Sequence, residues 1–165
     1  YLFSLFGSKA EFVESDVFHL SKRLTGIFDI SISWGLAEHF LKDKRTEVFK
    51  CHAKTLREGG ICLIGVPNKL SAPYQLFKGV AGFLRRWPYG LEMPFTGEEL
   101  ISCARLAGLV NEEVSSSSFY GAIADYLLLG LPKRFIIRDF AFPFDKYFGY
   151  WLMLSAERPC LDVTL

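Results

Sequence analysis

The stretch FDISISWGLAEHF, residues Phe28 to Phe40, combines the pattern of a β-strand with the start of a helix. Its first part, Phe28–Ser33, has the nearly continuous apolar character that is typical of a buried parallel strand. The segment Leu36–Leu56 then carries apolar side chains at helical spacing, and the pair Gly59-Gly60 is expected to stop the helix. Ile61–Val66 reads ICLIGV and predicts another buried strand. This order of strand, helix and strand predicts a βαβ unit with a right-handed crossover.

Further elements continue the alternation of strands and helices, which predicts an open α/β sheet. Thr96 is expected to cap a helix that runs to Leu106, because Glu99 stands three residues later and completes a capping box. The other predicted elements are strands at Ala10–Val13, Leu109–Ser117 and Tyr147–Ala156 and a helix at Gln75–Arg86.

Composition indicates one folded domain and excludes several kinds of partner. Half of the 165 residues are hydrophobic, and no linker divides the chain, so residues 1–165 are expected to form one domain. The net charge is +1, which gives no reason to expect nucleic acid as a partner. Four cysteines without a CxxC pair predict no metal site. The absence of a signal-peptide pattern favours a cytoplasmic location, and no apolar stretch is long enough to span a membrane.

Candidate binding residues follow the predicted strands, because ligands of open α/β sheets bind outside the carboxyl ends of the strands. Asp16 could accept a hydrogen bond from an exocyclic amine while Val17 covers a ring; the alternative is an aspartate that caps a helix or lies in a loop. Ser33, Trp34 and Gly35 form the turn after the second strand. Glycine lets the backbone approach a bound group, and the tryptophan either lines a pocket or packs in the core.

Glu38 and His39 are adjacent residues of the predicted helix. Adjacent helical positions point about 100° apart, so the two side chains are not expected to work as a paired acid and base. His39 is a candidate catalytic base, and the alternative, a structural role through hydrogen bonding, is favoured. His19 and His52 are expected to be ordinary histidines.

Four motifs in order resemble the central and C-terminal motifs of class I S-adenosylmethionine-dependent methyltransferases of the small-molecule type. The resemblance covers nearly the whole chain, and it implies a Rossmann-like open sheet with helices on both faces. Most strands would be parallel, with an antiparallel strand at the C-terminal end, and S-adenosyl-L-methionine would be the cofactor. The motifs are FVESDVFHL (Phe12–Leu20), FDISISWGLAEHF (Phe28–Phe40), LREGGICLIGVPN (Leu56–Asn68) and FTGEELISCARLAGL (Phe95–Leu109).

The resemblance also implies roles for single residues. Asp16 would hydrogen-bond the adenine amine, and Val17 would pack on the adenine ring. Ser33 and Trp34 would lie beside the methionine part of the cofactor, and Gly35 would let the chain pass close to it.

Two aromatic-rich segments, 69–95 and 119–146, would be insertions that form a lid over a small, partly apolar methyl acceptor. Methyl transfer in this family is an in-line displacement, so positioning contributes much of the catalysis. A general base is needed only where the acceptor must lose a proton.

The sequence departs from the family in one respect, because it contains no GxGxG loop. We therefore expect a chain that is incomplete at its N-terminus, the C-terminal two-thirds of a methyltransferase, in which Tyr1–Gly7 ends a helix. The alternative is a non-catalytic module of the same fold that serves as a subunit or scaffold. A third reading is association with a membrane surface through Phe135–Trp151, which the few basic residues of that segment disfavour.

Overall fold

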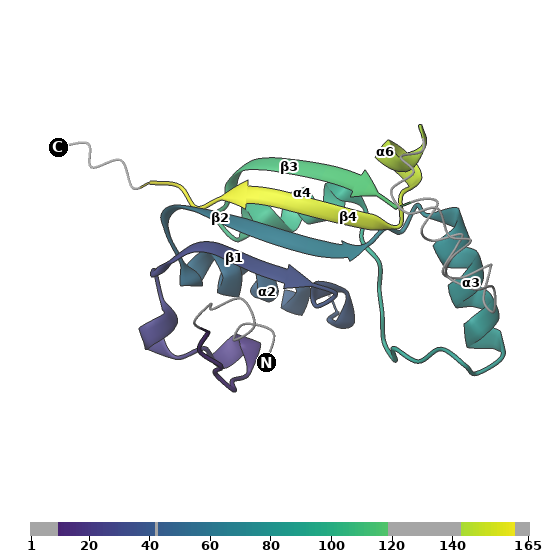
Figure 1. Ribbon diagram of the computed structural model, residues 1–165, viewed down its shortest axis with the longest axis horizontal. Coiled ribbons are helices and arrows are strands. Elements are labelled where there is room, and N and C mark those ends of the chain that lie inside the picture. The colour runs from purple at the N-terminus through teal and green to yellow at the C-terminus, as the bar shows by residue number, and fades with distance from the viewer. Residues whose placement is uncertain (1–9, 42, 119–142, 161–165) are drawn as a thin grey trace.

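A four-stranded mixed sheet forms the centre of the computed structural model, which describes residues 10–41, 43–118 and 143–160 (Figure 1). The strand order is β1-β2-β4-β3; β1 and β2 are parallel, and β4 runs antiparallel to both of its neighbours. The predicted α/β class and the antiparallel C-terminal strand are thus confirmed. The strands are β1 (Phe28–Trp34), β2 (Leu56–Pro67), β3 (Val110–Ser117) and β4 (Trp151–Glu157).

Two helices, α2 and α4, cover one face of the sheet (Figure 1). Helix α3 stands beyond the end of the sheet, and the short α6 precedes β4. The predicted helix after Thr96 is confirmed together with its capping box. The helices are α2 (Asp43–Thr55), α3 (Ala72–Phe83), α4 (Gly97–Leu106) and α6 (Asp145–Phe148), and the 3₁₀ turns are η1 (Val17–His19), η2 (Lys22–Leu24) and η3 (Ala37–His39).

The hydrophobic core lies between the sheet and these two helices. Alternate residues of β2 and β4 point into it, whereas their neighbours point to the opposite face. On that opposite face Ile30 and Ile32 of β1 are largely exposed, and a second helical layer does not occur among the described residues. The fully buried core side chains include Val48, Phe49, Cys62, Ile64, Val66, Leu100 and Leu154.

The βαβ unit is confirmed, but its glycine pair has another role than predicted. Helix α2 already ends at Thr55, and Leu56 pairs with Phe28 at the start of the parallel ladder. Gly59 and Gly60 lie inside β2, where the register shifts. A Cβ atom on Gly60 would lie 2.8 Å from the carbonyl oxygen of Arg57, so this irregularity requires a residue without a side chain.

Three predicted elements differ from the structure. Ala10–Val13 is exposed and irregular, because no strand of the described chain pairs with it. The predicted helix Leu36–Leu56 is divided into η3 and α2, with a break after Phe40, whose ring packs edge-to-face on Phe18 at 5.0 Å.

The last predicted strand, Tyr147–Ala156, begins later than expected because α6 takes up its first residues. Gly149 ends this helix where the backbone of β3 passes closely, since a Cβ atom there would lie 2.5 Å from the carbonyl oxygen of Ser117. The predicted helix end Tyr1–Gly7 and most of the aromatic segment 119–146 lie outside the described residues.

Candidate functional site

The carboxyl ends of the parallel strands β1 and β2 meet at one edge of the sheet, next to a sharp turn at Gly35. This glycine has a φ of +70°, and its N–H donates to the carbonyl oxygen of Gly65 at 2.9 Å. The left-handed backbone strongly favours glycine there. The turn brings bare main chain to the edge where ligands of open α/β sheets bind.

Trp34 lies beside this turn on the open face of the sheet. Its ring covers Gly65, where a Cβ atom would come within 2.5 Å of the indole, and it contacts the ring of Trp151 with centroids 4.6 Å apart. The side chain is nevertheless 52% exposed. Trp34 therefore packs on β2, as one of the two readings of the sequence expected, and it also presents an accessible ring; its role in lining a pocket stays a prediction.

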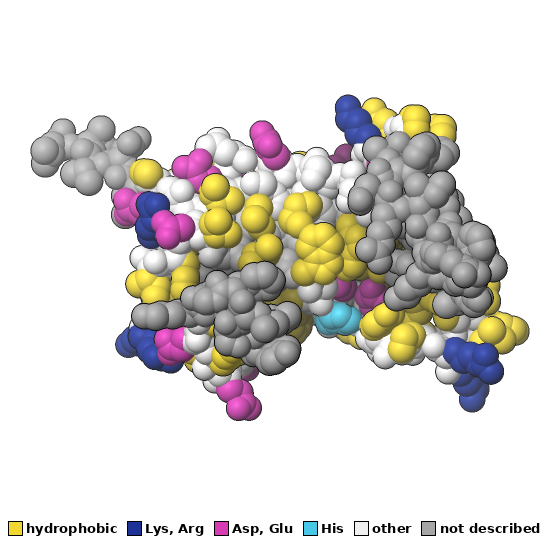
Figure 2. Space-filling view, in the orientation of Figure 1, with side chains coloured by type: hydrophobic (Ala, Val, Ile, Leu, Met, Phe, Trp, Pro, Cys, Tyr) yellow, Lys and Arg dark blue, Asp and Glu magenta, His cyan; other side chains and the backbone are white. Residues whose placement is uncertain are grey.

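A row of aromatic rings continues from this tryptophan toward α3. Trp151 contacts Tyr150 at 4.7 Å, and Tyr150 contacts Tyr74 of α3 at 5.2 Å. Figure 2 shows apolar side chains gathered on this face of the sheet. The row connects the carboxyl end of β1 with the first aromatic-rich segment.

Ser33 points to the opposite face, toward α2. Its hydroxyl oxygen lies 2.9 Å from His52 Nε2, and the hydroxyl oxygen of Ser31 lies 2.7 Å from His52 Nδ1. Burial lowers the pKa of His52 to about 4, so the imidazole is neutral and one ring nitrogen accepts while the other donates. The Ser33 side chain is thus engaged in the core, and only its backbone borders the turn. In ISISW (residues 30–34) the two serines alternate with larger apolar residues, which places both hydroxyl groups on the same face of the strand. This pattern is the sequence signal for the arrangement.

Glu38 occupies a 3₁₀ turn rather than the α-helix that the sequence predicts, and it is buried. Its side chain is 2% exposed, and the Oε2 atom has no hydrogen-bond partner among the described residues. Burial raises the pKa of this carboxyl group, and the nearby negative charge of Glu92 raises it further.

His39 is held in a fixed orientation by the loop that precedes α4. Its Nδ1 donates to the carbonyl oxygen of Leu91 at 2.7 Å, and its Nε2 lies 3.9 Å from Glu38 Oε1. The backbone N–H of Met93 also donates to the carbonyl oxygen of Glu38 at 2.8 Å. The favoured structural reading of His39 agrees with these contacts.

Arg45 fixes the same loop from α2. Its Nη2 donates to the carbonyl oxygen of Met93 at 3.0 Å, and the guanidinium group lies 3.4 Å from the ring centroid of Phe95. Sequence reasoning did not identify the partnership of this loop with Glu38, His39 and Arg45. The partners lie about 50 residues apart, and no local pattern connects them.

Asp16 caps the short turn η1. Its Oδ1 accepts from the N–H of Phe18 at 2.9 Å, and its Oδ2 lies 2.9 Å from His19 Nδ1. The backbone hydrogen bond and then the histidine lower the pKa of Asp16. This geometry matches the capping alternative, while Val17 is half-buried in the same turn. The contact of Phe18 with Phe40 places η1 next to the segment that follows Gly35.

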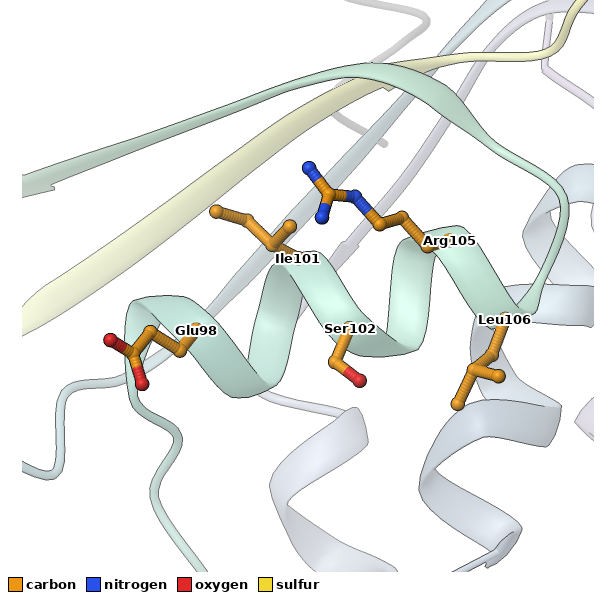
Figure 3. Close-up of a pocket in the computed structure, with 5 residues that line it drawn as sticks. All are labelled: Glu98, Ile101, Ser102, Arg105 and Leu106. Carbon is orange, nitrogen blue, oxygen red and sulfur yellow. The ribbon is translucent and has the colours of Figure 1, made fainter.

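A hollow lies along α4 (Figure 3), and Arg105, one of its lining residues, reaches Glu112 of β3, with 3.4 Å between Nε and Oε2. Side chains of this single helix line it: the half-buried Ile101 and the exposed Glu98, Ser102, Arg105 and Leu106. Within the described ranges no group of three or more histidine, cysteine or acidic side chains could hold a metal ion. None of the helices described there has both the length and the apolar character that crossing a bilayer requires.

No protein-family model and no curated protein matches the sequence, but solved structures match the fold. A S-adenosylmethionine-dependent methyltransferase from Thermotoga maritima has a TM-score of 0.60 at 16% identity, over 88% of this chain and 62% of its own. A methyltransferase of this type from Archaeoglobus fulgidus has a TM-score of 0.54 at 13% identity, over 88% and 66%. A third neighbour is the 1,6-didemethyltoxoflavin-N1-methyltransferase of Burkholderia thailandensis, whose structure contains bound 1,6-didemethyltoxoflavin and S-adenosylhomocysteine. Its TM-score is 0.54 at 16% identity, and the match covers 96% of this chain and 55% of that protein.

These likenesses confirm the fold that the sequence motifs imply. The chain has the Rossmann-like fold of class I S-adenosylmethionine-dependent methyltransferases. It spans less than two thirds of the length of each of the three proteins.

Proposed function

We propose that this protein takes part in methyl transfer from S-adenosyl-L-methionine to a small, partly apolar acceptor. The observation that carries the proposal is the left-handed turn at Gly35, which follows the carboxyl end of a parallel strand directly after the 52% exposed Trp34. In the Burkholderia neighbour, S-adenosylhomocysteine is bound together with a small acceptor. The cofactor would supply an electrophilic methyl group on a positively charged sulfur.

The candidate residues differ in how well their side chains could contact the cofactor. Trp34 and Gly35 would lie beside its methionine part, and Ser33 would contribute backbone because its hydroxyl bonds His52. Asp16 would bind the adenine amine and Val17 the ring face. Since both oxygens of Asp16 already have partners within η1, the carboxylate would have to share one of them.

The acceptor would lie against Trp34 and Trp151, at the accessible end of the aromatic row, with segment 69–95 as its lid. Flat apolar rings favour a partly apolar acceptor through burial and stacking. Positioning would contribute most of the rate, and His39 Nε2 is the candidate proton acceptor because the bond to Leu91 fixes the tautomer. The four cysteines are free, which supports a reducing, cytoplasmic setting.

One observation favours a second function. The sequence contains no GxGxG loop, the feature with which this family grips its cofactor. A chain of this fold without that loop would serve as a non-catalytic module or subunit.

Calorimetric titration with S-adenosylhomocysteine separates the two functions. The 165-residue chain and the longest form that its gene encodes would both be titrated. We expect binding by at least one form, weaker binding in Trp34→Ala and Asp16→Ala, and unchanged binding in Leu106→Ala, which alters an exposed side chain of α4. Binding by neither form would favour the non-catalytic module, and unchanged affinity in Asp16→Ala would remove the adenine assignment.

A further inference from the structure

Helix α3 carries an apolar stripe on its outer side. Leu76, Val80, Phe83 and Leu84 are 59%, 51%, 88% and 54% exposed. Their spacing of four, seven and eight residues from the first places them on one side of the helix. Single exposed apolar side chains are common, but a continuous stripe of four large ones marks an interaction surface.

The inner side of the same helix packs against the loop that follows it. Tyr74 is fully buried, and its ring lies 6.2 Å from that of Trp87, which also contacts Phe77 at 6.1 Å. Lys78 turns inward, where its ammonium group donates to the Tyr74 hydroxyl at 3.4 Å and to the carbonyl oxygen of Glu92. The stripe therefore lies on the side of the helix that does not pack against this loop.

The charge around the stripe has one sign. Residues 69–91 contain four basic side chains and no acidic one, although the whole chain has a net charge of only +1. Lys69, Arg85 and Arg86 are exposed, and the two arginines directly follow the end of the stripe. Figure 2 shows basic side chains beside apolar ones at the end of the molecule where α3 lies.

We propose that α3 docks on a membrane surface that contains anionic lipids. The stripe would enter the boundary between head groups and acyl chains, and Arg85 and Arg86 would lie at the lipid phosphates. Such a membrane surface is apolar below its head groups and negatively charged at them. The exposed apolar side chains of α3 match the first property, and the neighbouring basic side chains match the second. This surface of α3 differs from the segment Phe135–Trp151 considered from the sequence. It lies on the segment 69–95 proposed above as the lid, but its binding to lipid does not require methyl transfer.

The outer side of α4 offers a control surface on the same molecule. It exposes the apolar side chain of Leu106, at 67%, next to the half-buried Ile101, but Glu98 and Arg105 give it both signs of charge (Figure 3). A surface that exposes apolar side chains without an excess of positive charge should not bind anionic vesicles more strongly than neutral ones.

Vesicle co-sedimentation of the 165-residue chain tests the proposal without any cofactor. Vesicles of phosphatidylcholine alone are compared with vesicles that also contain phosphatidylglycerol, at low and high salt. We expect binding to the anionic vesicles only, with release at high salt. The double variant Arg85→Glu/Arg86→Glu should bind on the order of tenfold more weakly, Phe83→Ser should also lose binding, and Leu106→Ser should keep it.

Circular dichroism of each variant shows whether the fold is kept, and the arginine pair, being exposed, provides a test that does not alter packing. Absence of binding, or equal binding to both kinds of vesicle, would overturn the proposal. A dimer in gel filtration that depends on Phe83, without vesicle binding, would assign the stripe to a second copy of the chain and would overturn it as well.

Discussion

At the scale of the residue, His52 makes the stability of this protein depend on pH. Burial holds its folded-state pKa at about 4, below the ordinary value of 6.5. The unfolded chain therefore binds a proton first, so the stability from the neutral imidazole is complete above about pH 6.5 and is lost as the pH falls toward 4. This loss amounts to about 3 kcal/mol. Urea unfolding at several pH values should show it, and His52→Asn should flatten the curve. An equal slope in both proteins would contradict the prediction.

The ionisation of Glu38 makes stability depend on pH in the opposite direction. Burial raises its folded-state pKa above the ordinary 4.5, so the folded protein binds the proton more tightly than the unfolded chain. Its contribution to stability therefore decreases as the pH rises from about 4.5 through the raised value. We expect Glu38→Gln to raise the melting temperature at neutral pH and to have little effect at acidic pH. Thermal melts of both proteins check this, and a variant that melts lower at neutral pH would show that the carboxylate has a stabilising partner.

Gly65 is required by the ring that lies on it. A Cβ atom at this position would come within 2.5 Å of Trp34, so Gly65→Ala should displace the indole and cost about 1–3 kcal/mol. Tryptophan fluorescence and urea unfolding measure the two effects. Gly79 of α3 is the control, because a Cβ atom there meets nothing within 4 Å and alanine favours helix. Equal stability of the two variants would remove the steric argument.

At the scale of the element, the capping box of α4 gives a local prediction. The Thr96 hydroxyl accepts from the N–H of Glu99 at 3.2 Å, and the Glu99 carboxylate accepts from the N–H of Thr96 at 2.9 Å. Thr96→Ala should destabilise the protein by about 1 kcal/mol in urea unfolding. Ser71 precedes α3 without a capping hydrogen bond, so Ser71→Ala should cost less. The reverse order would contradict the capping argument.

Elements that depend on neighbouring residues could be predicted from the sequence. The capping box, the strand Phe28–Ser33 and the strand Ile61–Val66 each follow from a pattern within a few residues. The burial predicted for Phe28–Ser33 is wrong, because β1 is an edge strand of the described sheet with largely exposed side chains. The break after Phe40 could not be predicted, because it depends on Phe18 and on the loop before α4. The role of the Ser33 side chain could not be predicted for the same reason. Ser33 was expected beside the cofactor, but its hydroxyl group hydrogen-bonds His52, which lies nineteen residues away in the sequence.

At the scale of the whole molecule, the parallel pairing of β1 with β2 and the position of the turn at Gly35 agree with the sequence motifs, since these follow from the βαβ unit and its crossover. The buried carboxylates of Glu38 and Glu92 did not follow, because their burial is decided by how the loop before α4 closes on η3. Long-range closure of this kind leaves no periodic signal in a single sequence.

The strand order also predicts which strands exchange their amide hydrogens fastest. Strands β2 and β4 have a neighbour on each side, whereas β1 and β3 are the edges of the described sheet. Inner strands keep both rows of backbone hydrogen bonds, so their amide protons should exchange slowest, and those of β1 should exchange faster because its outer side chains are also exposed.

Hydrogen exchange followed by mass spectrometry measures this order directly, and β3 provides the comparison because it is an edge strand with the same number of neighbours as β1. Slow exchange in β2 and β4 with fast exchange in both edge strands would confirm the prediction. Protection of β1 equal to that of β2, with β3 still fast, would contradict it. That result would mean that another segment or another chain pairs with β1, because an exposed edge cannot otherwise protect its outward amide groups from water.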